Sequence, residues 1–305
     1  MNVVDNDDAT VADKNTENEL MFTASSTLLC GTGADGCAWW WAYSSDATKR
    51  YESDVYLDST VSWDTDRVTT DIGAYGGSQR PLATTTIHEI GHFLGLNHEW
   101  RYYNVMGLDF EYMTSNGTDY FPTLGEDATT GLASLYGYAT GYEDLSVSHW
   151  QYQQCQMDTA VVYGMSIRYC NGYSDHNRVR VLDSTGAELP ISWSSSEPTY
   201  TASKGSWLKA EVTLENNGAV SQRNTVQMYL SSLRQISPSS ATSIGSSTVT
   251  ATPNIPDLLT IWIALPSTLK SGSTYYIGAG VDATGTLTEV NEDNNYTYLA
   301  AVKIK

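Results

Sequence analysis

Histidine and glutamate residues between positions 88 and 98 have the spacing of metal ligands. In a helix, His88 and His92 lie one turn apart on the same face, so both imidazoles can bind one ion. Glu89 is displaced around that helix and can reach a water on the ion without becoming a ligand. Gly95 predicts the end of the helix, because glycine enters a left-handed bend at low cost, and the returning chain can supply His98. Three neutral imidazoles leave tetrahedral zinc one open position, which indicates a catalytic site.

This string matches H-E-x-x-H-x-x-G-x-x-H, the signature of the metzincin metallopeptidases, at every fixed position. Tyr103–Gly107 resembles the Met-turn of that family, in which a methionine, here Met106, packs beneath the metal. Leu124–Gly137 resembles the last helix of the matrixins, a group of metzincins. The resemblance covers residues from about 16 to 137. It implies zinc as the cofactor, with the ligands His88, His92 and His98.

The resemblance also implies a zinc endopeptidase whose partners are protein or peptide substrates. Zinc would lower the pKa of its water towards ~7, and Glu89 would take the proton and return it to the leaving amine. Two features depart from the matrixin pattern. Glu99, directly after the third histidine, is typical of astacins, but Leu108 stands where astacins have a tyrosine and counts against that group. Ala128 replaces the second aspartate of the last matrixin helix. The alternative is an inactive or astacin-like metzincin that acts mainly in adhesion or binding through its C-terminal region. The intact Glu89 favours the enzyme.

Strands before the helix and a loop after it must position these residues. Asp54–Asp58 alternates polar and apolar residues, as in a half-buried strand, and Trp39–Trp41 is expected to include a core face. Asp71–Gly77 resembles the region where matrixins offer an edge strand to a substrate peptide, but a plain glycine-rich loop remains open. Pro81 suits the first turn of the zinc helix. The loop Leu108–Thr123 is expected to wall the pocket for the residue after the cut.

The composition changes after Gly141, where helical signals end and Ser, Thr, Gly and Asn become frequent. From Ser206 onward, strands of alternating apolar and polar residues are separated by turn signals and predict a β-sandwich. We therefore expect an α+β metzincin catalytic domain, with a twisted sheet and the zinc helix, over residues 1–140. An all-β immunoglobulin-like sandwich is expected over residues 141–305 and is clearest at 203–305.

The end of the sandwich resembles CARDB modules, which are adhesion-related, immunoglobulin-like domains of bacterial exported proteins. Its acidic and amide residues from Glu289 to Asn295 are either a calcium loop or a turn bonded to itself. Asp144–Val147 can open the same sandwich, and whether residues 141–202 form a separate unit stays open. The sandwich is expected to bind substrate or a surface. If it only positions the enzyme, a chain ending near Gly141 should still cleave short peptides.

Charge and cysteine usage restrict the partners and the compartment. The net charge of −19 argues against nucleic acid and anionic membranes as partners, and no apolar run approaches the ~20 residues that span a bilayer. The spacing of the cysteines suggests two local disulfides, Cys30–Cys37 and Cys155–Cys170, which imply an oxidising compartment. Met1–Leu20 is acidic and polar and is therefore not a signal peptide. From the cysteines we expect a secreted protein, whose export signal and any propeptide are then absent from this sequence.

The histidines predict one zinc per chain. The chain has 5 histidines, and the two outside the signature, His149 and His176, lie beyond the predicted catalytic domain. The acidic surplus, including Asp64, Asp66 and Asp71, offers only oxygen ligands, which favour calcium over zinc. Calcium therefore remains open as a further structural ion.

Overall fold

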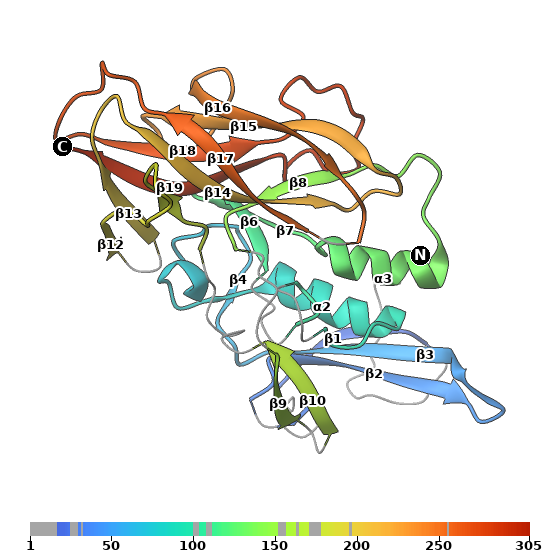
Figure 1. The fold of residues 1–305 in the computed structure, drawn as a ribbon. Helices are drawn as coiled ribbons and strands as arrows, with labels where there is room; N and C mark the ends of the chain where they lie inside the picture. Colours follow the sequence, from blue (N-terminus) through green and yellow to red (C-terminus); the bar gives the residue numbers. More distant parts are fainter. Residues whose placement is uncertain are drawn as a thin grey trace.

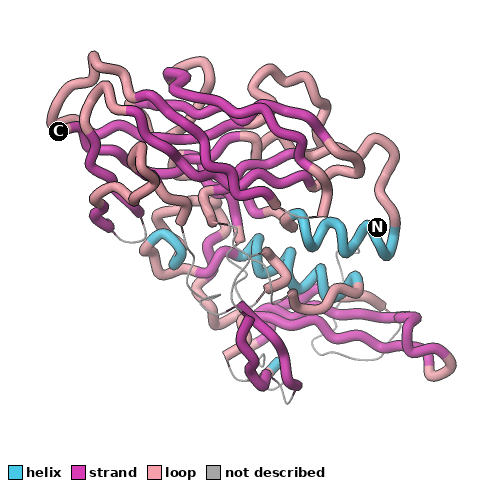
Figure 2. Tube along the Cα trace, in the orientation of Figure 1, coloured by secondary structure: helices cyan, strands magenta, loops and turns pink. Residues whose placement is uncertain are grey.

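The computed structural model describes residues 17–24, 30–31, 33–99, 104–107, 112–151, 157–162, 165–170, 178–194, 197–254 and 256–305. Figure 1 shows a layer of helices, α2 and α3, between a small N-terminal sheet and a large C-terminal β-sandwich. Strands and loops make up more of the described chain than helices do (Figure 2). No helix in these ranges has the length and apolar character needed to cross a membrane.

The N-terminal sheet has the strand order β1-β3-β2 in the described residues. Strand β3 (Asp46–Asp58) pairs in parallel with β1 (Leu20–Thr23) and antiparallel with β2 (Gly36–Tyr43). The predicted strand at 54–58 therefore forms, but it is not half-buried: all of Asp54 to Leu57 are buried. As the central strand it is covered on both faces. Of the stretch Trp39–Trp41, which is expected to include a core face, Trp41 is half-buried, whereas Trp39 and Trp40 are 43% and 48% exposed.

Helix α2 (Leu82–Leu94) packs against β2 and β3 and carries the front half of the signature. Pro81 is its N-cap, one residue outside the predicted position, and also pairs through β5 (Arg80–Pro81) with β4 (Trp63–Asp64). The helix ends at Gly95, as predicted, where a φ of 112° requires the left-handed conformation that glycine adopts easily.

The segment Asp71–Gly77 is a compact loop and not an edge strand. The 3-10 helix η1 (Gly73–Tyr75) forms its centre, and the N–H of the capping residue Gly76 donates a hydrogen bond to Gly73 O. A Cβ atom on Gly77 would lie 2.1 Å from the backbone carbon of Asp71, so the chain folds tightly back on itself. Ile72 and Tyr75 are buried in the process. The edge-strand interpretation is wrong because apolar side chains draw this loop inward.

A hairpin and the second helix follow the signature. Residues 108–111 lie outside the described part of the predicted pocket loop, and the rest forms β6 (Met113–Asn116) and β7 (Asp119–Pro122). This hairpin turns towards the sandwich, since β6 contacts β8 and β19. Helix α3 (Glu126–Tyr136) forms where the last helix was predicted.

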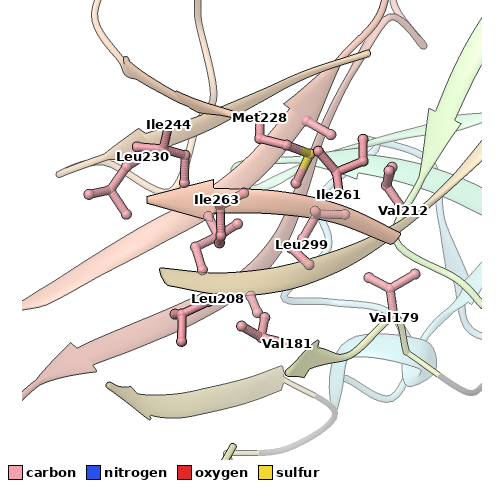
Figure 3. Packing of buried hydrophobic residues seen from close by; sticks show 14 of the residues in the cluster. Val179, Val181, Leu208, Val212, Met228, Leu230, Ile244, Ile261, Ile263 and Leu299 are labelled. Atoms are coloured by element: carbon pink, nitrogen blue, oxygen red, sulfur yellow. The ribbon is translucent and has the colours of Figure 1, made fainter. Parts of the chain in front are cut away.

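The C-terminal sandwich contains two packed sheets. In the described residues one sheet combines β11-β14-β17 with β8 on β14, and the other has the order β12-β13-β19-β18-β15-β16. Side chains from both sheets fill the space between them, among them Val212, Met228 and Ile263 (Figure 3). The strands are β8 (Leu145–Ser148), β11 (Val181–Leu182), β12 (Ile191–Ser194), β13 (Glu197–Ala202), β14 (Trp207–Asn216), β15 (Gln222–Ser231), β16 (Thr242–Ala251), β17 (Asp257–Ala264), β18 (Thr274–Gly280) and β19 (Tyr296–Ile304).

Within the segment 141–202, the strands β8, β11, β12 and β13 belong to this sandwich. Strand β8 confirms that the residues around Leu145 open it, because they pair with β14. A separate antiparallel hairpin, β9 (Met157–Val162) and β10 (Met165–Cys170), lies away from the sandwich, on the side of the helices where the N-terminal sheet is (Figure 1). The Cys30–Cys37 disulfide forms, with Cα atoms 5.5 Å apart. Cys155 lies outside the described residues, so its pairing with Cys170 stays a prediction.

The acidic loop near the end of the sandwich is bonded to itself. The Asp282 carboxylate accepts hydrogen bonds from the backbone of Thr286 and Leu287, and Asn295 Nδ2 donates to Glu289 Oε2 at 2.7 Å and to Glu292 Oε2 at 2.9 Å. The sequence left open a calcium loop or a turn bonded to itself, and these contacts are those of a turn bonded to itself.

A buried polar interface joins α3 to the sandwich. Glu215 of β14 accepts hydrogen bonds from Tyr112 Oη and from the backbone N–H of Glu126, at the N-terminus of α3. In return the Glu126 carboxylate accepts the backbone N–H of Asn216 at 2.9 Å. Gly125 provides no side-chain cap, so a carboxylate from the sandwich takes that place, where the helix dipole favours it. Burial raises the pKa of Glu215 to about 7.

An aromatic interface lies beside it. His149 is fully buried and its Nε2 lies 2.7 Å from Tyr75 Oη. Trp150 Nε1 donates to Met113 O at 3.0 Å, and the Arg178 guanidinium lies 5.3 Å from the Trp150 ring. Residues from before and after the predicted boundary at residue 140 thus pack together in one buried cluster.

Candidate metal centre

Three imidazoles meet at one point beside α2. His92 Nε2 lies 3.1 Å from His98 Nε2, which in turn lies 3.3 Å from His88 Nε2. Two of these residues come from one face of α2 and the third from the segment after Gly95. In the described residues this is the group of ligand atoms that is close enough to hold a metal ion.

The hydrogen bonds of the Nδ1 atoms show which ring nitrogens of His88 and His92 carry the proton. His88 Nδ1 lies 2.5 Å from Val105 O, and His92 Nδ1 lies 2.9 Å from Leu96 O. A carbonyl oxygen only accepts, so each Nδ1 carries the proton and each Nε2 is a bare lone pair. Even if His98 Nε2 carries a proton, it can donate that proton to only one of the two neighbouring Nε2 atoms, those of His88 and His92. Lone pairs that face one another at these distances are stabilised by a cation, so the residues fit zinc.

Burial keeps these imidazoles neutral, which is the form that binds metal. It lowers the pKa of His88 to about 3 and that of His98 to about 4, and it lowers the pKa of His92 as well. A buried imidazolium would lack the water that solvates its charge. The site therefore does not have to release protons from the histidines at neutral pH before it binds an ion.

Glu89 lies next to the imidazoles without being one of the converging ligands. Its side chain is 5% exposed, and its Oε2 has no hydrogen-bond partner in the described part of the chain. Burial raises the pKa of this carboxyl to about 8. The nearest strand approaches closely, since a Cβ atom on Gly36 would lie 3.2 Å from Glu89 Cγ. A carboxylate oxygen that is not used in the fold is available for proton transfer.

Met106 forms the floor of the site. It is 1% exposed, and its N–H donates to Asn104 Oδ1 at 2.7 Å in a tight turn. Its carbonyl accepts the N–H of Glu99 at 2.9 Å, which ties the segment after His98 to this turn. The predicted Met-turn residue thus lies directly beneath the zinc helix.

Gly91 is a residue of the site that the sequence analysis did not single out. A Cβ atom there would lie 2.3 Å from Met106 Sδ. The sequence did contain a signal for this role, namely a glycine in the interior of a predicted helix. Glycine there destabilises the helix by about 1 kcal/mol relative to alanine, so its presence indicates that another group approaches the helix closely.

We expect Gly91→Ala to weaken the metal site. The added methyl group displaces Met106 and, through the Glu99 N–H bond, the segment that carries His98. Overpacking of this kind costs roughly 1–3 kcal/mol. Thermal melting and zinc affinity of the variant and of the parent protein, measured side by side, check it. An unchanged zinc affinity in Gly91→Ala would contradict the prediction.

Strand β2 is one of the two edge strands of the N-terminal sheet, and its first residue, Gly36, lies beside Glu89. Asp58 N–H donates to Asp35 O at 2.8 Å, and hydrogen-bonded pairs alternate along an antiparallel ladder. The backbone groups of Gly36, Ala38 and Trp40 therefore point away from β3. In the described residues no other strand pairs with this side of β2. The structure thus supplies an edge strand, in a different segment from the one predicted.

Comparison with protein families agrees with the site. Residues 10–137 match the matrixin family of peptidases, peptidase M10. No curated protein matches the chain. A crystal structure of a CARDB domain from Pyrococcus furiosus, in complex with di-metal ions, is 17% identical, covers 54% of this chain and 90% of its own, and has a TM-score of 0.29. A solution structure of the same domain is 22% identical, covers 34% of this chain and 87% of its own, and has a TM-score of 0.26.

The matched family segment contains the converging histidines, Glu89 and Met106, and it ends at the residue that closes α3. The signature, the Met-turn and the last helix occur in it in the order expected from the resemblance. Residues 10–137 of this chain are therefore similar to the matrixin family, and a β-sandwich follows them.

Proposed function

We propose that this chain is a secreted zinc endopeptidase that hydrolyses internal peptide bonds of proteins. The observation that carries the proposal is that the Nε2 atoms of His88, His92 and His98 meet at one point. Beside them lies the buried carboxylate of Glu89, which has an unused oxygen. Structural metal sites are closed by four protein ligands, whereas three histidines leave room for water and substrate.

Zinc held by these histidines would supply a Lewis acid for the attacking water and the scissile carbonyl. Glu89 accepts the proton of that water on its free oxygen and then delivers it to the leaving amine nitrogen. Burial alone raises the pKa of Glu89 to about 8, while a nearby cation opposes that shift. The two influences leave the carboxyl able both to take a proton and to give it up near neutral pH.

Strand β2 is proposed to hold the substrate. Its outward backbone groups from Gly36 to Trp40 can add an extended peptide as a further strand, and Gly36 places the start of that edge next to Glu89. A folded substrate cannot reach these backbone groups, so extended or unfolded segments are expected to be cut.

The Cys30–Cys37 disulfide supports the extracellular location, since such bonds persist in oxidising compartments. Binding of substrate or of a surface by the sandwich stays a proposal, as does structural calcium. The alternative of an inactive adhesion protein is disfavoured by the unused oxygen of Glu89, because a carboxylate kept buried without a partner lowers stability unless it has another role.

Metal analysis and chelation test the proposal. The dialysed protein should contain one zinc per chain and cleave a proteome-derived peptide library, and it should lose cleavage on zinc removal and regain it on zinc addition. His149 is engaged with Tyr75 in the core and offers no second zinc site, while His176 lies outside the described residues. Any further ion should be calcium. A reproducible second zinc, or a zinc-loaded protein that cleaves nothing in the library, would contradict these expectations.

A further inference from the structure

Side chains from outside the zinc helix bind the carbonyl groups at its C-terminal end. Arg50 Nη1 donates to His92 O at 2.5 Å and lies 3.4 Å from Phe93 O. Tyr136 Oη donates to Leu94 O at 2.6 Å. The last carbonyls of a helix lack the regular partner one turn further on, and His92 O accepts the N–H of the capping Gly95 at 3.0 Å in addition to Arg50. The partial negative charge at this helix end favours a cation. The guanidinium therefore binds the backbone of a zinc-ligand residue directly.

The same guanidinium also contacts the edge strand. Arg50 lies on β3, and its Cζ lies 4.4 Å from the centre of the Trp40 ring of β2. Trp40 is one of the residues whose backbone points to the open edge, and α2 packs across both strands (Figure 1). The Arg50 side chain thus contacts both the zinc helix and the edge strand, whose relative position matters for the proposed reaction.

We propose that Arg50 is a positioning residue that clamps the His92 end of the zinc helix to the Trp40 segment of edge strand β2. The role in substrate alignment rests on the proposed function, whereas the effect on the metal site does not. A shift of the His92 carbonyl moves the helix turn that carries the His92 imidazole. The clamp therefore sets both the ligand geometry and the distance between the metal and the substrate edge.

Arginine suits this task better than lysine. Its planar guanidinium can stack on an indole and at the same time donate in its own plane to carbonyl oxygens. A lysine ammonium at the same place can replace the charge and one hydrogen bond, but not the stacking. Arg50→Lys should therefore retain the helix end and lose the register with Trp40.

The first experiment measures zinc release from the zinc-loaded full chain into excess chromophoric chelator. Arg50→Gln should release zinc about tenfold faster than the parent protein, in line with other groups that orient metal ligands. Lys49→Gln is the matched control, because Lys49 is the neighbour on the same strand, its side chain is 72% exposed, and it pairs with Asp46 at 3.5 Å. The absorption spectrum of the cobalt-substituted protein, taken well below the melting temperature, should change in Arg50→Gln alone. A role in overall stability would move the melting temperature and leave this spectrum unchanged.

The second experiment tests the link to Trp40. Trp40→Leu should speed zinc release less than Arg50→Gln does, and the double variant should resemble Arg50→Gln, since both changes break one clamp. In cleavage assays Arg50→Lys should raise KM for a long peptide several-fold with kcat nearly unchanged. Zinc release within twofold of the parent in Arg50→Gln, or additive effects in the double variant, would overturn the clamp. An absence of peptidase activity in the parent would instead overturn the proposed function, because the zinc and cobalt measurements do not depend on cleavage.

Discussion

Glu89→Gln is expected to abolish peptide hydrolysis while the protein keeps its zinc. Glutamine has the size and shape of the glutamate but cannot take a proton from water, and general base catalysis contributes roughly 10²–10⁴-fold to such rates. The ligands His88, His92 and His98 keep their contacts, because none of the hydrogen bonds between them and the backbone involves Glu89.

The stability of this variant separates catalysis from folding. The Glu89 carboxyl is buried and its Oε2 has no partner in the described residues. Replacing a group that resists ionisation by a neutral amide should leave the melting temperature equal or higher. Initial rates on a fluorogenic peptide, zinc content and thermal melting are measured side by side. The exposed Glu188→Gln serves as the control. Activity within tenfold of the parent would remove Glu89 from the role of base.

A chain ending at Gly141 is expected not to fold stably, and so to lose cleavage even of short peptides. Truncation removes Trp150, which packs with Tyr75, Met113 and Tyr120 in one buried cluster. Exposing each large apolar side chain costs roughly 1.5–3 kcal/mol, and a few such losses equal the whole stability of a typical domain, about 5–15 kcal/mol. Helix α3 also loses the Glu215 carboxylate that accepts its first N–H.

This expectation reverses the one from sequence, where the sandwich only positions the enzyme. Circular dichroism, thermal melting and short-peptide cleavage of the truncated chain check it. The full chain with Trp262→Ala is the control, because that tryptophan lies on the sandwich but is 47% exposed and away from the interface. A truncated protein that melts cooperatively and cleaves short peptides at the parental rate would show that the interface is dispensable.

The local part of the metal site could be predicted from the sequence alone. His88 and His92 are one helical turn apart, so a helix necessarily brings their rings together. Gly95 ends that helix and turns the chain, because its backbone angle is nearly closed to other residues. The β-sandwich was predictable for a similar reason: alternating residues such as Leu208, Ala210 and Val212 form one buried face in any extended strand.

Other features depended on contacts between distant segments, which local periodicity does not encode. The glycine-rich segment 71–77 carries the same residues whether it is an edge strand or a loop, and burial of Tyr75 against His149 selects the loop. Gly36 becomes the strand edge beside Glu89 through pairing with β3. Glu215 caps a helix almost ninety residues earlier in the chain. In each case the free energy comes from burying groups far apart in sequence, so the partner appears only when the chain is folded.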